Sequence, residues 1–510
     1  MLVTLFVLIC SFVGWLCYTH YYKPYYVIKK ALRLSGPQPS LYYGSCKEVA
    51  TLGYLESRRK WASKYGTTFL YYLGIKPVVV TQDLEVIRSV MVKNFDRFIN
   101  RVYTPPLLSK DEKNVRGLLF ARGEEWRRMR RVLTPMFSSK KLRMMVPLIQ
   151  ESCERLNEKI STASNSGESV DMWKWFGLFT MEVILATAFS RDAGTQNCSD
   201  NPLTKAAASV FKTTSFGNEA LEKLLTMLSH FPWMEQVLRK FIIRSQAARS
   251  FNYLENTALK LIEDRRRSMS TAVDNLPQDL LQLLLEAHDE DEIGTETRSR
   301  GCLSNEEVVR AIITILLAGY ETTSNALGYT AYLLALNPAI QDKLTREIHD
   351  YYGANPDASL YDAAENIDYV TMVLSESLRL FPPAPRTNRE CNQTCVVSDN
   401  LVILKGVDVN IPIFLLHRNP NYWLNPEKFD PERFRPGEPS YPPFAYLPFG
   451  EGPRNCIGKR LALLEAKMAL VSIIKDFHFK RTTDTEIPLD LRVGVTMSPK
   501  SGIYLNIVSI

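Results

Sequence analysis

The stretch Phe449-Gly450-Glu451-Gly452-Pro453-Arg454-Asn455-Cys456-Ile457-Gly458 determines which fold this chain is expected to adopt. Three glycines and a proline surround a single cysteine, and they predict an irregular loop whose backbone can approach another group closely. A helical pattern follows over residues 459–475. A thiolate on such a loop can bind a soft metal, and a single cysteine ligand suits haem iron. The alternative is a buried, inert cysteine, which is the usual state of an isolated one.

A second motif places Trp126 and Arg130 four residues apart in a helical pattern that Pro135 ends. The two side chains therefore share one helix face, where an indole N–H and a guanidinium can both donate to an anion. The alternative is a solvated basic helix. We prefer that alternative, or a docking surface for an acidic partner, for the neighbouring Arg127, Arg128 and Arg131.

A third motif lies inside a long helix that the capping box Ser304-Asn305-Glu306-Glu307 opens and that is predicted to end near Asn337-Pro338. It reads Ala318-Gly319-Tyr320-Glu321-Thr322-Thr323. A glycine within a helix costs about 1 kcal/mol relative to alanine, so we expect Gly319 to let a flat ligand approach the backbone. The Glu321 carboxylate and Thr322 hydroxyl can pass protons, which cleavage of bound dioxygen requires. The alternative for Thr322 is a hydrogen bond back to a helix carbonyl.

A fourth motif pairs Glu376 with Arg379, three residues apart on a helix predicted over residues 369–380. The Glu-x-x-Arg spacing is common in proteins and is weak evidence when it stands alone. Further along, Pro431-Glu432-Arg433-Phe434 supplies another arginine ahead of the cysteine loop.

Together these motifs resemble those of the cytochrome P-450 superfamily, in which they occur in the same order. Agreement of Trp-x-x-x-Arg, Ala-Gly-x-Glu-Thr, Glu-x-x-Arg, Pro-Glu-Arg-Phe and the cysteine loop is far more specific than any one of them. Residues 318–324 and 452–458 are most similar to the three-A subfamily, its invertebrate relatives and thromboxane synthase. The resemblance implies a mainly α fold with small β-sheets, forming a single large catalytic domain over residues 41–510 behind one N-terminal transmembrane helix.

The resemblance also assigns roles to individual residues. It implies that the Cys456 thiolate is the axial ligand of haem b, that Thr322 lies beside dioxygen and that Glu321 belongs to a proton relay. Glu376, Arg379 and Arg433 would form a buried ion network. The residues expected to contact the haem, mainly through its propionates, are Arg101, Trp126, Arg130, Arg386, Phe449 and Arg454.

The implied reaction is a monooxygenation that inserts one oxygen atom of O2 into a lipophilic steroid, fatty acid or xenobiotic. The sequence has no flavin or nicotinamide fingerprint, so electrons would come from a separate NADPH-dependent cytochrome reductase, with cytochrome b5 as a further candidate donor. Two alternatives are a haem-thiolate isomerase acting on a lipid peroxide, as thromboxane synthase does, and a non-catalytic haem or lipid carrier. Thromboxane synthase lacks threonine at the position of Thr322, which favours the monooxygenase.

The N-terminal residues 2–18 are almost wholly apolar and carry no charge, and extended to residue 22 they could span a bilayer. Tyrosines and lysines follow, so the positive-inside rule places the downstream chain in the cytosol. The resemblance to microsomal P-450 chains implies that the membrane is that of the endoplasmic reticulum. A cleaved signal peptide is the alternative, but large aromatics occupy the place of its small-residue cleavage site. We expect an anchor over residues 1–22 and a basic, proline-containing hinge over residues 23–40.

Composition agrees with a folded, cytosol-facing protein. Of the 510 residues, 45% are hydrophobic and 23% charged, which excludes a disordered chain. The net charge of +7 is spread along the chain without a Lys/Arg block, so nucleic acid is not an expected partner. The nine cysteines lack the spacing of a disulfide framework, which favours a reducing compartment.

Other segments carry local predictions. A hairpin is predicted from residues 68–73 and 78–81, and Asp83 is expected to cap a helix that runs to about Lys93. Residues 396–413 have β character, and a C-terminal hairpin is predicted from residues 489–495 and 503–508. By resemblance residues 202–244 form lid helices over the substrate pocket, and residues 288–300 are an expected exposed loop.

Overall fold

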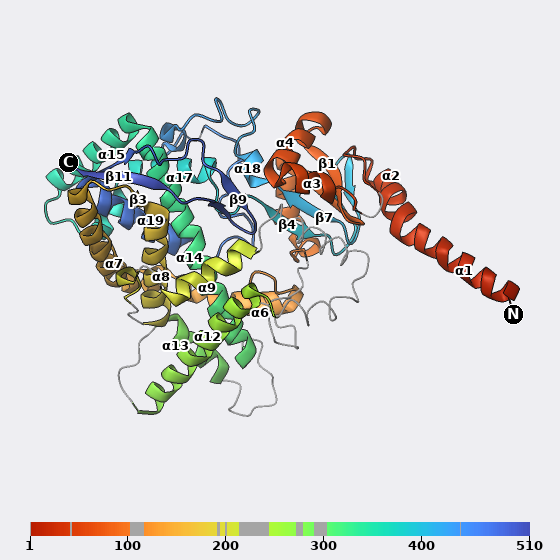
Figure 1. Ribbon diagram of the computed structural model, residues 1–510, viewed down its shortest axis with the longest axis horizontal. Coiled ribbons are helices and arrows are strands. Elements are labelled where there is room, and N and C mark those ends of the chain that lie inside the picture. Colours follow the sequence, from red (N-terminus) through yellow and green to blue (C-terminus); the bar gives the residue numbers. More distant parts are fainter. Residues whose placement is uncertain are drawn as a thin grey trace.

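In the computed structural model, one long helix, α14 (Asn305–Leu336), runs through the middle of a mainly helical body (Figure 1). Ser304 caps it: its hydroxyl accepts from the backbone N–H of Glu307, whose carboxylate accepts from the N–H of Ser304 at 2.8 Å. The predicted capping box and the predicted end of this helix are both confirmed. Because α14 is surrounded by α8 (Met172–Phe189), α12 (Gln246–Thr271), α17 (Asp368–Leu380) and α19 (Lys459–Ile474), its apolar residues face nearly every direction.

The structure describes residues 2–40, 43–102, 117–190, 194–198, 201–213, 244–271, 279–289, 303–438 and 440–510. The expected lid region and the expected loop over residues 288–300 lie mostly outside these ranges. The other α-helices of the body described are α3 (Cys46–Leu52), α4 (Tyr54–Tyr65), α5 (Leu84–Arg88), α6 (Gly123–Leu133), α7 (Ser139–Ser166), α9 (Pro202–Thr213), α13 (Leu280–Asp289), α15 (Pro338–Ala354), α16 (Leu360–Asn366) and α18 (Ile413–Leu416).

A four-stranded sheet lies at one side of the body, next to α3 and α4 (Figure 1). Its order is β1 (Thr68–Leu73), β2 (Lys76–Thr81), β7 (Asp408–Ile411) and β4 (Thr387–Glu390). β1 and β2 form the predicted antiparallel hairpin, whereas β7 runs parallel to β2 and antiparallel to β4. Asp83 then caps α5 by accepting from the N–H groups of Glu85 and Val86, as predicted.

The C-terminal strands pair differently from the prediction. β9 (Leu491–Val493) pairs with β10 (Met497–Pro499), while β11 (Tyr504–Ser509) pairs with β8 (Phe477–Arg481) and β3 (Val170–Asp171). The chain turns back earlier than expected, because the N–H of Gly494 donates to the carbonyl of Thr496 at 2.7 Å. The closer partner closes a shorter loop at a smaller entropic cost. A further two-stranded sheet joins β5 (Cys395–Ser398) to β6 (Leu401–Ile403).

The N-terminal helix projects from the body on the side of the four-stranded sheet (Figure 1). It comprises α1 (Leu2–Cys17), a π-helical segment (Tyr18–Ile28) and α2 (Lys29–Leu32), and Val3–Leu32 is long and apolar enough to cross a membrane. The expected hinge over residues 23–40 is therefore helical as far as Leu32. Tyr25 is buried against the β1–β2 hairpin, where its ring lies 4.9 Å from that of Tyr72 and its hydroxyl donates to the carbonyl of Gly74 at 3.0 Å. Leu32 is buried in the same hydrophobic cluster, on α2, which contacts β6.

A buried ion network joins α17 to the segment ahead of the cysteine loop. The Arg379 guanidinium donates to both carboxylate oxygens of Glu376, at 2.7 and 2.8 Å, and Arg433 Nε donates to Glu376 Oε1 at 3.3 Å. Arg379 also donates to the backbone carbonyls of residues 417 and 426 at 2.7 Å and of residue 428 at 3.1 Å. Glu376 and Arg379 are both 0% exposed, so the predicted buried network is confirmed.

We expect Arg379→Ala to lower the free energy of unfolding by about 3–5 kcal/mol, because it leaves the buried Glu376 carboxylate without its main partner. Denaturant unfolding of the detergent-solubilised protein measures the change. Arg435→Ala is the matched control, since Arg435 forms an exposed pair with Glu432 at 2.6 Å and such pairs contribute at most about 1 kcal/mol. Equal stability of the two variants would show that the network has no structural role.

Candidate functional site

The loop around Cys456 is closed by its own backbone hydrogen bonds. The N–H of Cys456 donates to the carbonyl of Phe449 at 2.8 Å, and the N–H of Gly450 donates to the carbonyl of Leu447 at 3.0 Å. Gly452 has a φ of +72°, and a Cβ there would lie 2.0 Å from the carbonyl oxygen of Met91. Only glycine fits at this position, so the predicted irregular loop with a close backbone approach is confirmed.

Several groups act on the Cys456 thiol. The residue retains accessible surface, but the atoms around the thiol are dense enough that burial raises its pKa. The N–H of Gly458 and the positive charges of Arg130, Arg101 and Lys459 oppose that rise. Cys456 also lies just before the N-terminus of α19, where the helix dipole favours a thiolate. The loop therefore presents a thiol that can bind a metal as a thiolate.

The face of α6 that carries Trp126 and Arg130 is turned toward this loop. Arg130 donates to both the backbone carbonyl and the side-chain oxygen of Asn455, at 2.9 and 2.8 Å. The Arg454 guanidinium lies 4.6 Å from the Trp126 ring and donates to the carbonyl of Ala121. The structure thus brings Trp126, Arg130 and Arg454 together beside Cys456, as the sequence predicts.

Two further arginines face this group. Arg101 Nη1 donates to Thr387 Oγ1 at 2.9 Å, and Arg389 is 1% exposed and affected by the charges of Arg101 and Arg454. Burial lowers the pKa of Arg101 to about 10 and that of Arg454 to about 9, and it lowers the pKa of Arg389 well below its ordinary value. We call Arg101, Arg130, Arg389 and Arg454 the arginine cluster.

The arginine cluster holds more positive charge than its neighbours balance. None of its members forms an ion pair with a carboxylate in the described part of the chain. Within the same ranges, Nε of Arg454 and both Nε and Nη2 of Arg389 have no hydrogen-bond partner. Buried guanidinium groups without acceptors are costly, so the cluster is suited to a ligand carrying carboxylates. Two propionates beside a thiolate-bound iron meet that description, so these residues fit haem.

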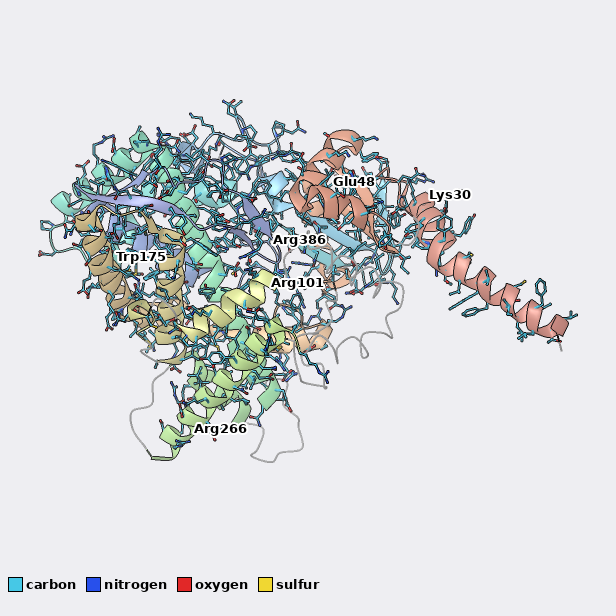
Figure 2. The ribbon with its side chains drawn as sticks, in the orientation of Figure 1. Lys30, Glu48, Arg101, Trp175, Arg266 and Arg386 are labelled. Carbon is cyan, nitrogen blue, oxygen red and sulfur yellow. The ribbon has the colours of Figure 1, made fainter. Side chains whose placement is uncertain are left out.

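Arg386 lies against α4. Its guanidinium is 4.8 Å from the ring of Tyr54 on α4, and it occupies the junction between the four-stranded sheet and the helical body, as Arg101 does (Figure 2). Side chains alternate along β4, so Thr387 and Arg389 lie on its buried side and Arg386 shares the parity of the less buried residues 388 and 390. We therefore replace Arg386 with Arg389 as the candidate propionate ligand. The parity of β4 is seen in its burial pattern, because the polar sequence of this strand has no apolar alternation that would indicate it.

His417 is another residue that the motifs did not reveal. Its imidazole is fully buried, and burial lowers its pKa to about 3, so the ring is neutral. Nε2 accepts from the N–H of Leu447 at 2.8 Å, which leaves Nδ1 to donate to the carbonyl of Arg379 at 3.1 Å. His417 therefore connects the buried ion network directly to the start of the cysteine loop.

The motif on α14 has a different geometry from the one expected. A Cβ at Gly319 would lie 2.9 Å from Ile184 Cδ1 on α8, so the glycine serves the contact between two helices and not the approach of a ligand. Ala318 is instead the exposed residue in this buried part of α14, and Thr322 is half-buried. Thr322 Oγ1 donates to the carbonyl of Ala318 at 2.6 Å, which is the back-bonded alternative.

Glu321 is 2% exposed and accepts a hydrogen bond from Thr496 Oγ1 at 2.9 Å. Burial raises the pKa of Glu321 to about 7, against the opposing effects of Thr496 and Arg492. Its carboxyl can therefore exchange a proton near neutral pH, which is the property a proton relay needs.

Comparison with known proteins agrees with this geometry. The Cytochrome P450 family profile matches residues 34–506. The chain belongs to the cytochrome P450 family. Similar proteins are Cytochrome P450 3A29 of Sus scrofa and Cytochrome P450 3A5 of Homo sapiens, each 34% identical over 485 residues, and Thromboxane-A synthase of Sus scrofa, 32% identical over 507 residues. Each comparison covers 94% of this chain and 92% of the relative.

Membership confirms several expectations drawn from the motifs. This cytochrome P450 is an oxidoreductase of the monooxygenase family with a mainly α fold, and it binds haem b through a cysteine thiolate. It uses O2, an organic substrate and a redox partner of the reductase kind. The relationship and the apolar N-terminal helix indicate anchoring in the endoplasmic reticulum membrane.

Arg389→Met and Arg386→Met form a matched pair that tests the arginine cluster. We expect Arg389→Met to weaken haem binding by about 10- to 100-fold, the equivalent of one charge-assisted hydrogen bond, and to stabilise the haem-free protein by removing a buried charge. Arg386→Met should leave haem affinity within about twofold. Haem titration and denaturant unfolding of the apoprotein measure both effects. Weaker haem binding in Arg386→Met than in Arg389→Met would contradict the assignment.

Proposed function

We propose that this cytochrome P450 inserts one oxygen atom of O2 into a lipophilic steroid, fatty acid or xenobiotic, using electrons from an NADPH-dependent cytochrome reductase. The second oxygen atom leaves as water, so each turnover consumes two electrons and two protons. The observation that carries the proposal is the pairing of Glu321 with Thr322 on the central helix. A buried acid next to a hydroxyl suits a reaction that takes up protons, whereas a reaction without proton uptake needs no proton donor.

The proposal assigns the haem site to Cys456 as the thiolate ligand. Arg101, Trp126 and the rest of the arginine cluster would bind the propionates, and Phe449 would lie against the haem beside the ligand. Bound haem supplies the binding and activation of dioxygen, which a thiolate ligand favours. The hydrogen bond from the N–H of Cys456 to the carbonyl of Phe449 closes the loop and keeps the sulfur in one place.

The protons would come through the side chains of α14. Glu321 holds a proton on its carboxyl up to about pH 7 and is shielded from bulk water. Thr322, the next residue, has a half-buried hydroxyl that donates to the carbonyl of Ala318 and can accept a hydrogen bond in return. We infer that Glu321 supplies the proton and that the Thr322 hydroxyl orients the group that receives it.

The isomerase alternative has one supporting fact, the 32% identity to Thromboxane-A synthase of Sus scrofa. An isomerase that rearranges a lipid peroxide needs neither a reductase nor a proton supply, so it gives no reason for a buried Glu321 that titrates near neutral pH. A haem or lipid carrier gives no reason for it either. The Glu321–Thr322 pair therefore favours the monooxygenase.

We further propose that the catalytic domain faces the cytosol and that basic residues near the cysteine loop attract an acidic reductase, with cytochrome b5 as a second candidate donor. Arg127 already pairs with Glu124 and Asp96, at 2.6 and 2.7 Å, and Arg128 pairs with Glu307. Lys140 and Lys459 are exposed and are better placed to attract a partner.

Thr322→Ala tests the proposed reaction. With a reductase and a lipophilic substrate, the variant should still consume NADPH but release hydrogen peroxide, and product formed per NADPH should fall by roughly 10²-fold. Isomerisation of a lipid peroxide would be unaffected by the change. Thr330→Ala is the matched control, because the Thr330 hydroxyl makes the same kind of bond on the same helix, to the carbonyl of Ala326 at 2.8 Å.

Before that comparison, a library of steroids, fatty acids and drugs should be screened for compounds that shift the spin state of the haem. Binding compounds then serve as substrates in the NADPH assay. If the wild-type protein and a reductase consume no NADPH with any of them, the proposed reaction is wrong.

A further inference from the structure

The β9–β10 hairpin is attached to the central helix at Glu321 and over the next two turns. Thr496 Oγ1 donates to Glu321 Oε1 at 2.9 Å although the two residues are 175 positions apart. Asn325 Nδ2 and the Tyr329 hydroxyl both donate to the carbonyl of Met497, at 2.9 Å each. The hairpin therefore has a fixed position on α14, and the Thr496 hydroxyl has a fixed position relative to the acid.

Water is largely excluded from this contact. Thr496 is 8% exposed, Ser498 1% and Asn325 0%, and Glu321 itself is 2% exposed. A buried carboxylate needs hydrogen bonds or a nearby cation to remain charged. Burial raises the pKa of Glu321, and the Thr496 hydroxyl, Arg492, Asn325 and Ser498 lower it, so that it settles near 7.

The cation comes from the same hairpin. Arg492 of β9 is the register partner of Ser498 of β10, and its Nη2 donates to Ser498 Oγ at 2.9 Å. Ser498 also lowers the pKa of Glu321 through a side-chain hydrogen bond, so the side chain that Arg492 bonds is itself in contact with the acid. The other titratable groups near the acid are Tyr320 and Tyr329, which burial keeps neutral by raising their pKa, and Asp171, which acts on Tyr320. Arg492 is thus the cation that lowers the pKa of Glu321.

We propose that Thr496 and Arg492 are positioning residues for Glu321, which hold its carboxyl in one place and set the pH range over which it keeps its proton. The inference rests on the proposed function insofar as Glu321 supplies protons for oxygenation. It goes beyond that function by assigning control of the proton supply to a C-terminal hairpin that none of the family motifs includes.

Removing either group should shift the titration of Glu321 in a known direction. Both the Thr496 hydroxyl and the Arg492 charge favour the carboxylate, so Thr496→Val and Arg492→Met should raise the titration midpoint above about 7, each by roughly one pH unit. Thr496→Ser keeps the donor and should keep the wild-type midpoint. Thr496→Val preserves the branched shape of the side chain and removes only the hydrogen bond.

The direct measurement is infrared difference spectroscopy of the haem-loaded protein between pH 5 and 9, with Glu321→Gln subtracted to isolate the Glu321 carboxyl. Product formed per NADPH is measured over the same range. In the wild type it should fall as pH rises through about 7, because deprotonated Glu321 has no proton to give. In Thr496→Val and Arg492→Met the fall should move to higher pH with the infrared midpoint.

Stability gives a readout independent of turnover. Unfolded Glu321 loses its proton near pH 4.5, but the folded protein retains it up to about pH 7. The stability attached to this proton is complete below pH 4.5 and is lost as pH rises through 7. In Glu321→Gln the free energy of unfolding should no longer fall as pH rises through 7. In Thr496→Val this fall should continue to higher pH.

The outcomes separate the two proposals. An unchanged infrared midpoint in both Thr496→Val and Arg492→Met would overturn the positioning role. If the infrared midpoint moves but product per NADPH in Glu321→Gln keeps the wild-type pH profile, the positioning role stands and the proton supply assigned to Glu321 is wrong. Should Thr496→Val not fold, the less buried Arg492→Met decides the outcome alone.

Discussion

The interaction on which the site depends is the attraction between half-buried positive charge and the sulfur of Cys456, which opposes the rise in the thiol's pKa that burial causes. Arg101 and Arg130 favour the thiolate, and the N-terminus of α19 adds a contribution of about 0.3–1 kcal/mol in the same direction. The same two arginines repel Arg454, and a ligand that supplies negative charge would relieve this repulsion. A haem with two propionates satisfies both requirements, so cofactor and protein stabilise each other.

This arrangement requires a rigid backbone, because the arginines stay close to one another in spite of their repulsion only if the backbone holds them in place. The Glu376–Arg379 pair is one rigid part of this frame. His417 connects it to the cysteine loop, because its imidazole donates to the carbonyl of Arg379 and accepts from the N–H of Leu447. Gly452 lets the loop lie against the backbone of Met91. The central helix α14 contacts both α17 and α19, and its Glu321 accepts a hydrogen bond from Thr496 of the C-terminal hairpin.

The sequence predicts best what depends on neighbouring residues. The capping box at Ser304, the pairing of Glu376 with Arg379 and the loop around Cys456 follow from short spacings, and the structure contains them. Contacts between distant segments were not predictable in the same way. Gly319 faces Ile184 on another helix, and Thr496 reaches Glu321 from the far end of the chain, so no local pattern marks either contact. We infer Arg389 in place of Arg386 from the burial pattern of β4, and the residues of this strand, Thr387-Asn388-Arg389-Glu390, show no apolar alternation from which the parity could be read.

The most direct test replaces Cys456 with serine, with the exposed Cys198→Ser as the matched control. The measurement is the carbon monoxide difference spectrum of the reduced, haem-loaded protein, whose red-shifted band would require the thiolate as a ligand of the iron. The band should disappear in Cys456→Ser and persist in Cys198→Ser. A normal red-shifted band in Cys456→Ser would show that another residue binds the iron and would contradict the assignment of this site.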